Sequence, residues 1–141
     1  MHRKSIWAVV AGVIFIIGVT TIVDIALHAL GVFPPMDQPL DDRLAALATS
    51  YRILISVAGA WLTARLAPAK PMQHALILGI VGTVLGLVGV VATWNRGLGP
   101  RWYPIGLAAL AIPQCWVGGK LYEMGPGNRH SGRRAAPLNP R

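Results

Sequence analysis

Charged side chains are scarce in this sequence. Asp, Glu, Lys and Arg together make up 13% of its 141 residues, about half the share that soluble domains usually carry, whereas apolar residues make up 54%. A soluble domain this short exposes much of its surface and needs charge to cover it. The shortage therefore argues against a soluble protein and predicts a chain that has lipid as its solvent.

Cysteine and the usual catalytic patterns are also missing. Cys115 is the single cysteine, so no internal disulfide forms. The sequence contains no phosphate-binding loop, nucleophile elbow, HExxH or CxxC pattern. Asp24 and His28 have a spacing that suits two metal ligands, but we expect no third ligand near them. We therefore expect no cofactor and no metal, and the sequence indicates no enzymatic activity.

The net charge of +8 does not indicate a nucleic-acid partner. The basic residues stand in short groups beside long apolar runs, and they form neither a basic amphipathic face nor an RNA-binding signature. The expected partner of the chain is the lipid bilayer.

Four long apolar runs are present, at about residues 6–33, 44–67, 75–94 and 102–122. A helix needs ~20 residues to cross the hydrocarbon core, and none of the runs shows the alternation of a strand. The first run lacks the small residues of a signal-peptide cleavage site and is interpreted as an uncleaved anchor that stops at Pro34-Pro35. The fold class predicted is all-α: a membrane four-helix bundle with up-down-up-down topology and short loops.

Two regions follow from this pattern. Residues 1–124 form the predicted four-span domain. Residues 125–141 are rich in Gly, Pro and Arg and have almost no large apolar side chain, which predicts a disordered, basic, cytoplasmic tail.

The Lys and Arg residues outside the spans predict the orientation, because cytoplasmic loops carry an excess of them. With the N-terminus inside, nine fall inside and three outside. Those inside are Arg3, Lys4, Arg65, Lys70, Lys120, Arg129, Arg133, Arg134 and Arg141, and those outside are Arg43, Arg96 and Arg101. We expect a multi-pass protein of the plasma membrane with both termini in the cytoplasm. Small size and ten arginines against three lysines suggest a bacterial inner membrane.

The second run is the least certain span by composition, because it contains Arg52, which is costly in lipid. An even number of crossings keeps both basic ends on one side, which favours a span here. Trp94, Trp102 and Tyr103 then lie together at the outer interface, where aromatic residues are enriched.

Small residues in the third run recur at helical spacing, as expected where backbones approach closely. Gly79, Gly82, Gly86 and Gly89 share one face. Packing within the chain is the main interpretation, and self-association or contact with a membrane partner protein is the alternative. Similar faces occur in the second run and the fourth run. They are Thr49, Arg52, Ser56, Gly59 and Thr63, and Ala108, Ala111, Cys115 and Gly118.

Asp24 and Arg52 are the charges deep within the predicted spans. Asp24 is nine residues before Phe33, and Arg52 is eight residues after Leu44, so both lie ~12–14 Å below the outer boundary of adjacent helices. Each charge has reason to seek the other in lipid. Other polar residues lie near them, although Tyr51 is expected to point elsewhere. The predicted cluster comprises Asp24, Arg52, His28, Thr20, Thr21, Thr49 and Ser56.

Two interpretations of this cluster are open. An ion pair that locks two helices together is the structural one. The functional one is a proton-linked or anion-binding site, in which Asp24 and His28 titrate and Arg52 holds a carboxylate, phosphate or quinone oxygen. The functions that follow are a non-enzymatic membrane component acting through helix packing or complex assembly, a proton-linked small-solute transporter or channel, and, with least support, a membrane enzyme acting on lipid or quinone.

Overall fold

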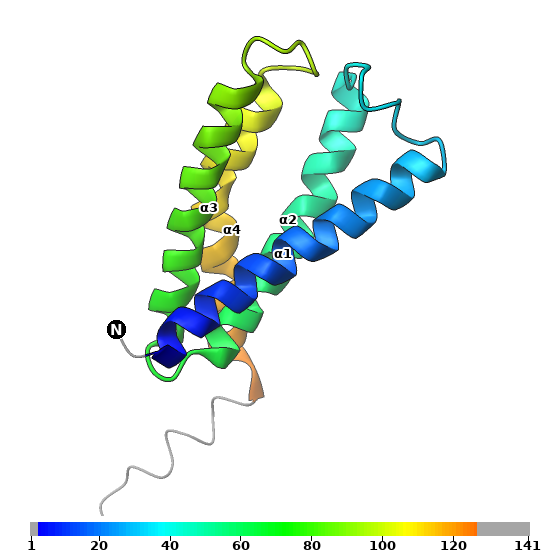
Figure 1. Cartoon of the computed structure of the whole chain (residues 1–141). Helices are drawn as coiled ribbons and strands as arrows, with labels where there is room; N and C mark the ends of the chain where they lie inside the picture. The colour runs from blue at the N-terminus through cyan, green and yellow to red at the C-terminus, as the bar shows by residue number, and fades with distance from the viewer. Residues whose placement is uncertain (1–2, 127–141) are drawn as a thin grey trace, which may run out of the picture.

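The computed structural model describes residues 3–126, and these form four helices (Figure 1). Their bounds are α1 Arg3–Ala29, α2 Asp42–Leu66, α3 Pro71–Thr93 and α4 Trp102–Met124. The described residues contain no strand, so the predicted all-α class is confirmed. The predicted tail lies outside the described residues from residue 127 onward.

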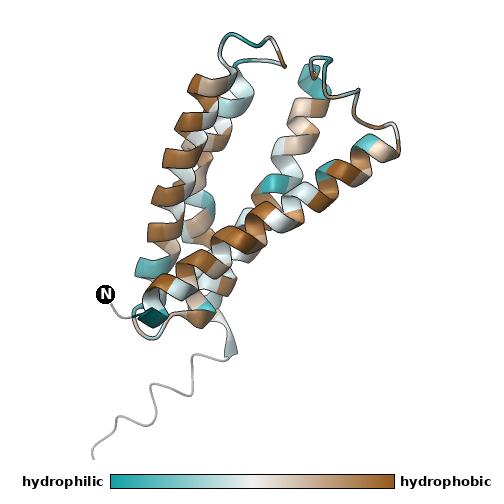
Figure 2. Ribbon diagram, viewed as in Figure 1, coloured by the Kyte–Doolittle hydropathy of each residue, from teal (hydrophilic) through white to brown (hydrophobic). Residues whose placement is uncertain are grey.

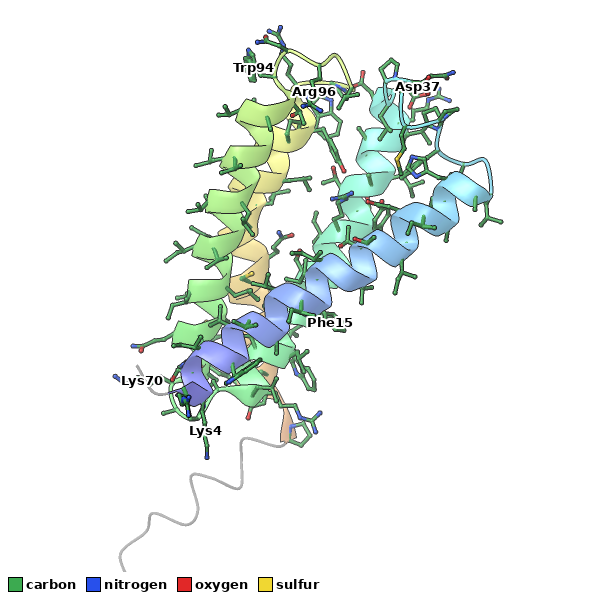
Figure 3. All side chains as sticks on the ribbon, in the orientation of Figure 1. Lys4, Phe15, Asp37, Lys70, Trp94 and Arg96 are labelled. Carbon is green, nitrogen blue, oxygen red and sulfur yellow. The ribbon has the colours of Figure 1, made fainter. Side chains whose placement is uncertain are left out.

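Successive helices run in alternating directions (Figure 1). The start of α1, the turn between α2 and α3 and the end of α4 lie together at one end of the molecule, here called the terminal end. The segments 30–41 and 94–101 lie at the opposite end, here called the loop end. Lys4 and Lys70 lie at the terminal end, and Asp37, Trp94 and Arg96 lie at the loop end (Figure 3).

Three of the helices, α1, α2 and α3, are long and apolar enough to cross a membrane. Figure 2 shows the strongly hydrophobic residues running along α1 and α3. Large apolar side chains point outward along these helices, as at Ile22, which is 67% exposed, and Val91, which is 80% exposed. Lipid is the solvent in which such surfaces are stable, so the fold is that of a candidate multi-pass membrane protein.

The helix ends differ from the predicted spans at two places. Helix α1 ends at Ala29 rather than near Phe33, because Gly31 adopts a left-handed φ of 71° and the Val32 N–H donates to the Leu27 carbonyl. This turn stops the helix before the proline pair is reached. Helix α3 begins at Pro71, four residues earlier than predicted, because proline fits the first turn of a helix.

Helices α3 and α4 pack with their backbones close together. A methyl group added at Gly86 would lie 2.9 Å from the Ala108 Cα, and one added at Gly79 would lie 3.0 Å from the Ile112 Cα. Gly82 faces Ala111 in the same way, at 3.3 Å from its Cβ. These glycines are therefore used for contact within the chain.

Helix α2 packs against both α1 and α4 through small residues. Gly118 of α4 meets the Val57 carbonyl of α2, and Gly59 of α2 meets Ile16 of α1. The face of α4 that was predicted to be inward is buried, and Cys115 is only 3% exposed. The main buried cluster comprises Ala60, Ala75, Leu78 and Cys115.

Helix α1 leans away from α3 toward the loop end (Figure 1). Within residues 3–126 it contacts α2 and α3 but not α4, which lies diagonally across the bundle. The loop end is tied across, because the Leu40 N–H donates to the Leu98 carbonyl at 2.9 Å and the Trp102 Nε1 donates to Asp42 at 2.7 Å. The four helices thus enclose a space that is capped at the loop end.

Candidate functional site in the helical bundle

Asp24 of α1 and Arg52 of α2 form an ion pair. The Arg52 Nη2 donates to the Asp24 Oδ2 at 2.6 Å. The Arg52 side chain is 30% exposed and the Asp24 side chain 27%, so neither charge is sealed from its surroundings. The contact joins the last third of α1 to the first half of α2, nearer the loop end than the terminal end, at the pairing that the sequence predicts.

Tyr51 also binds the Asp24 carboxylate, by donating its hydroxyl to Oδ1. This corrects the expectation that Tyr51 points elsewhere. Tyr51 and Arg52 are neighbours on α2, so their side chains project ~100° apart. The Asp24 carboxylate lies between these two directions, and each of its oxygens binds one of the two side chains. Both oxygens of Asp24 are therefore occupied by α2.

Tyr103 brings α4 to the same cluster. The Arg52 guanidinium carbon lies 5.9 Å from the centre of the Tyr103 ring and 6.0 Å from that of Tyr51. Contact between a guanidinium and an aromatic ring is favourable, particularly where water is scarce. The sequence assigned Tyr103 to the outer interface. It gave no signal for this contact, because α2 and α4 are not consecutive helices.

His28 lies one turn beyond Asp24 but does not bind its carboxylate. Its Nδ1 is 2.7 Å from the Asp24 backbone carbonyl, and its ring meets the Phe33 ring edge-on at 5.4 Å. Phe33 is buried and also faces Tyr51, at 6.5 Å between ring centres. The aromatic ring of Phe33 thus covers the cluster on the side of the loop end.

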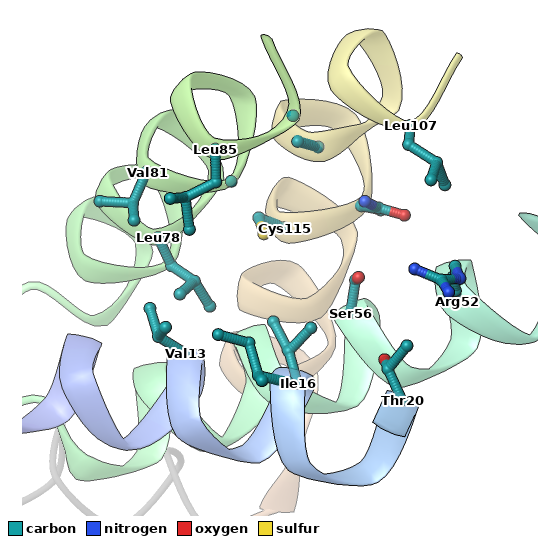
Figure 4. Close-up of a pocket in the computed structure, with 15 residues that line it drawn as sticks. Val13, Ile16, Thr20, Arg52, Ser56, Leu78, Val81, Leu85, Leu107 and Cys115 are labelled. Atoms are coloured by element: carbon teal, nitrogen blue, oxygen red, sulfur yellow. The ribbon is translucent and has the colours of Figure 1, made fainter. Parts of the chain in front are cut away.

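The four predicted hydroxyl residues of the cluster have different surroundings. Thr20 and Ser56 are buried and face the space between the helices (Figure 4). Thr49 instead donates to the Ala45 carbonyl of its own helix, and Thr21 is exposed on the outside of α1. The structure therefore groups Thr20 and Ser56 with Arg52 and separates Thr21 from them.

A cavity of about 270 Å³ adjoins this cluster and is lined by all four helices (Figure 4). Its polar lining comes from Thr20, Arg52, Ser56 and Gln114. The rest of the lining is largely apolar and includes Ile16, Leu78 and Leu85. The cavity therefore has a polar region beside Arg52 and a longer apolar region along α1 and α3.

Two polar atoms at this cavity lack hydrogen-bond partners. Among the residues that the structure describes, four buried side-chain atoms are unpartnered, and the Arg52 Nε and the Gln114 Oε1 are two of them. Leaving such groups unpaired is costly and uncommon in folded proteins. Gln114 is a site residue that sequence reasoning missed.

The predicted glycine face is divided between two environments. Gly79, Gly82 and Gly86 contact α4, whereas nothing lies within 4 Å of a methyl group added at Gly89. Gly89 lines a second cavity of about 550 Å³ between α3 and α4 at the loop end. Arg101 lies at this cavity, with its guanidinium carbon 4.9 Å from the centre of a Trp94 ring.

Within residues 3–126, no three His, Cys, Asp or Glu side chains are grouped closely enough to hold a metal ion. Comparison of the chain with protein-family models, with curated proteins and with solved structures found no match. The chemistry of the site is therefore argued from its geometry.

Proposed function

We propose that this chain is a four-span protein of the plasma membrane that acts without catalysis, through the packing of its helices against those of another membrane chain or of a second copy. Helix α4 is the fourth span in this proposal. It is as long as α3, at 23 residues, and it packs along the length of α3. With four crossings, the basic terminal end lies in the cytoplasm, and the loop end, which includes the acidic first loop, lies outside. Small size and the excess of arginine are the features that support a bacterial inner membrane as its location.

The observation that carries this proposal is Gly18 in the middle of α1. A methyl group added there would meet nothing within 4 Å, so no contact within the chain requires a glycine. Glycine weakens a helix relative to alanine, and in membranes it marks positions where another helix approaches. Ile14, Ile22 and Ile25 lie on the same side of α1 and are all exposed. We infer that a helix of another chain packs on this face.

The geometry of the polar cluster supports a role without catalysis. Both oxygens of Asp24 are occupied, by Tyr51 and by the guanidinium of Arg52. A carboxylate that is neutralised by Arg52 and bound through both of its oxygens is suited to holding α1 on α2.

Photo-crosslinking in native membranes tests the proposal. A photoreactive amino acid at Ile22, beside Gly18, is expected to give a discrete protein adduct, and the same amino acid at Val91 on the outer face of α3 is expected to label lipid. The proposal fails if Ile22 also labels only lipid and the extracted protein is monomeric and copurifies with nothing.

The second candidate function is a proton-linked transporter or channel for a small solute. Partial exposure of the Asp24 and Arg52 side chains, next to a cavity, favours it. His28 lies one turn away from Asp24 on α1. Solute flux into liposomes would then depend on pH and would be lost in Asp24→Asn and Arg52→Ala. Flux that is unchanged in both variants would exclude this candidate.

A further inference from the structure

We propose that the 270 Å³ cavity binds a neutral lipophilic molecule that carries a hydroxyl head group. Arg52 and Gln114 both line this cavity, and the Arg52 Nε and the Gln114 Oε1 are buried and unpartnered. Arg52 lies on α2 and Gln114 on α4, so the two residues reach the cavity independently of each other. A ligand that pairs with both would remove two unmade hydrogen bonds.

The chemistry of the two atoms defines the head group. The Arg52 Nε–H donates and cannot accept, whereas the Gln114 Oε1 accepts and cannot donate. A hydroxyl group does both, because its oxygen accepts from Arg52 while its hydrogen is donated to Gln114. A hydrocarbon satisfies neither atom, and a ketone satisfies only the Arg52 Nε.

The charges around the cavity favour a neutral ligand over an anion. Asp24 neutralises the Arg52 guanidinium at 2.6 Å, and the other polar groups of the lining, on Thr20, Ser56 and Gln114, carry no charge. Tyr51 and Tyr103, which face Arg52, contribute aromatic rings. An anion entering this space would be repelled by Asp24 and would have no free positive charge to gain.

Size and access define the rest of the ligand. An engineered cavity of ~150 Å³ holds a benzene molecule, so about 270 Å³ accommodates roughly ten to twelve heavy atoms. The apolar region is lined by Val13, Ile16, Leu78, Val81 and Leu85, which suits a short hydrocarbon chain. Contacts between segments 30–41 and 94–101 cap the loop end. Entry from the lipid between α1 and α3, which diverge toward the loop end, is the route that remains.

A photoactivatable derivative of 1-decanol with a diazirine in its chain tests this site in the intact protein in lipid nanodiscs. We expect it to label the segment 78–85, where the apolar lining of α3 lies. Unlabelled 1-decanol should suppress this labelling at about one tenth of the concentration that decane requires, because only the alcohol pairs with Arg52 and Gln114. Absence of labelling in 78–85, or equal competition by the two compounds, would overturn the proposal.

Gln114→Leu removes the acceptor while keeping a side chain of similar size. The advantage of 1-decanol over decane should fall from tenfold to about threefold in this variant, because only the hydrogen bond from the Arg52 Nε remains, and the competition by decane should be unchanged. Gln73→Leu is the matched control, since Gln73 is exposed at the start of α3, and it should keep the full advantage. If Gln114→Leu kept the full advantage as well, the hydroxyl would not be recognised by Gln114 and the assignment would be wrong.

Discussion

Two helix pairs with the same topology are held together by different interactions. The α3–α4 pair is joined by backbone contact, with Gly79 and Gly86 against α4. The α1–α2 pair is joined nearer the loop end by Asp24, Tyr51 and Arg52, and nearer the terminal end by Gly12 and Gly59. In lipid, close packing and polar contacts are the interactions that remain to bring helices together. The pair with small residues throughout stays close along its length, whereas the pair with a polar contact diverges from its neighbours and leaves a cavity.

The largest effect is expected from Gly86→Leu. The added side chain would overlap the Ala108 backbone, which cannot move without separating α3 from α4. We expect a loss of about 3 kcal/mol in the free energy of unfolding, measured by denaturant titration in mixed micelles. Gly89→Leu is the control and should change stability little, because nothing lies within 4 Å of that position. Equal losses of stability in Gly86→Leu and Gly89→Leu would show that close contact at glycine is not what holds α3 and α4 together.

A smaller effect is expected from breaking the ion pair. Asp24→Asn and Arg52→Gln should each cost about 2 kcal/mol, because each leaves a partly buried charge without its partner. The double variant should cost clearly less than the sum, and this difference is the coupling between the two residues. Lys120→Gln is the control, since its partner Glu123 is 3.5 Å away on the surface and the pair should contribute little. Strictly additive losses would mean that Asp24 and Arg52 do not stabilise each other.

Tyr51→Phe should have the smallest effect of the three. It removes one hydrogen bond to Asp24 and leaves the ring in place, so a loss of about 1 kcal/mol is expected. Tyr122→Phe serves for comparison, because the Tyr122 ring packs edge-on against Trp61 at 6.3 Å and its contribution is mainly apolar. If Tyr51→Phe were as stable as the parent chain, the Tyr51 hydroxyl would not contribute to the stability of the cluster.

The sequence predicted the features of the fold that depend on composition and spacing. The four helices, the inward face of α4 and the Asp24–Arg52 pair follow from apolar runs, from the helical period and from the cost of charge in lipid. The end of α1 was predicted too late, because the proline pair is an obvious stop whereas Gly31 acts through a local left-handed turn.

The parts of the site that were missed depend on the tilt of one helix relative to another. Tyr51 reaches Asp24 because of the angle at which α1 crosses α2, and a helical period read from one segment does not contain that angle. Tyr103 and Gln114 join the cluster and the cavity from α4, through contacts between segments distant in the sequence. The apolar part of the cavity, along α1 and α3, results from the divergence of α1, for which the sequence gave no signal.

The number of crossings is the claim on which the proposed role depends most, and α4 decides it. Three helices are apolar enough to span by themselves, and the fourth is assigned from its length and its packing on α3. Single cysteines placed in a Cys115→Ser background at Lys4, Asp37, Leu98 and Glu123 can be labelled with a membrane-impermeant maleimide in sealed cells. The account predicts labelling at positions 37 and 98, and protection at 4 and 123 until the membrane is opened. Labelling of position 123 in sealed cells with protection of position 4 would place the two ends on opposite sides and contradict the account.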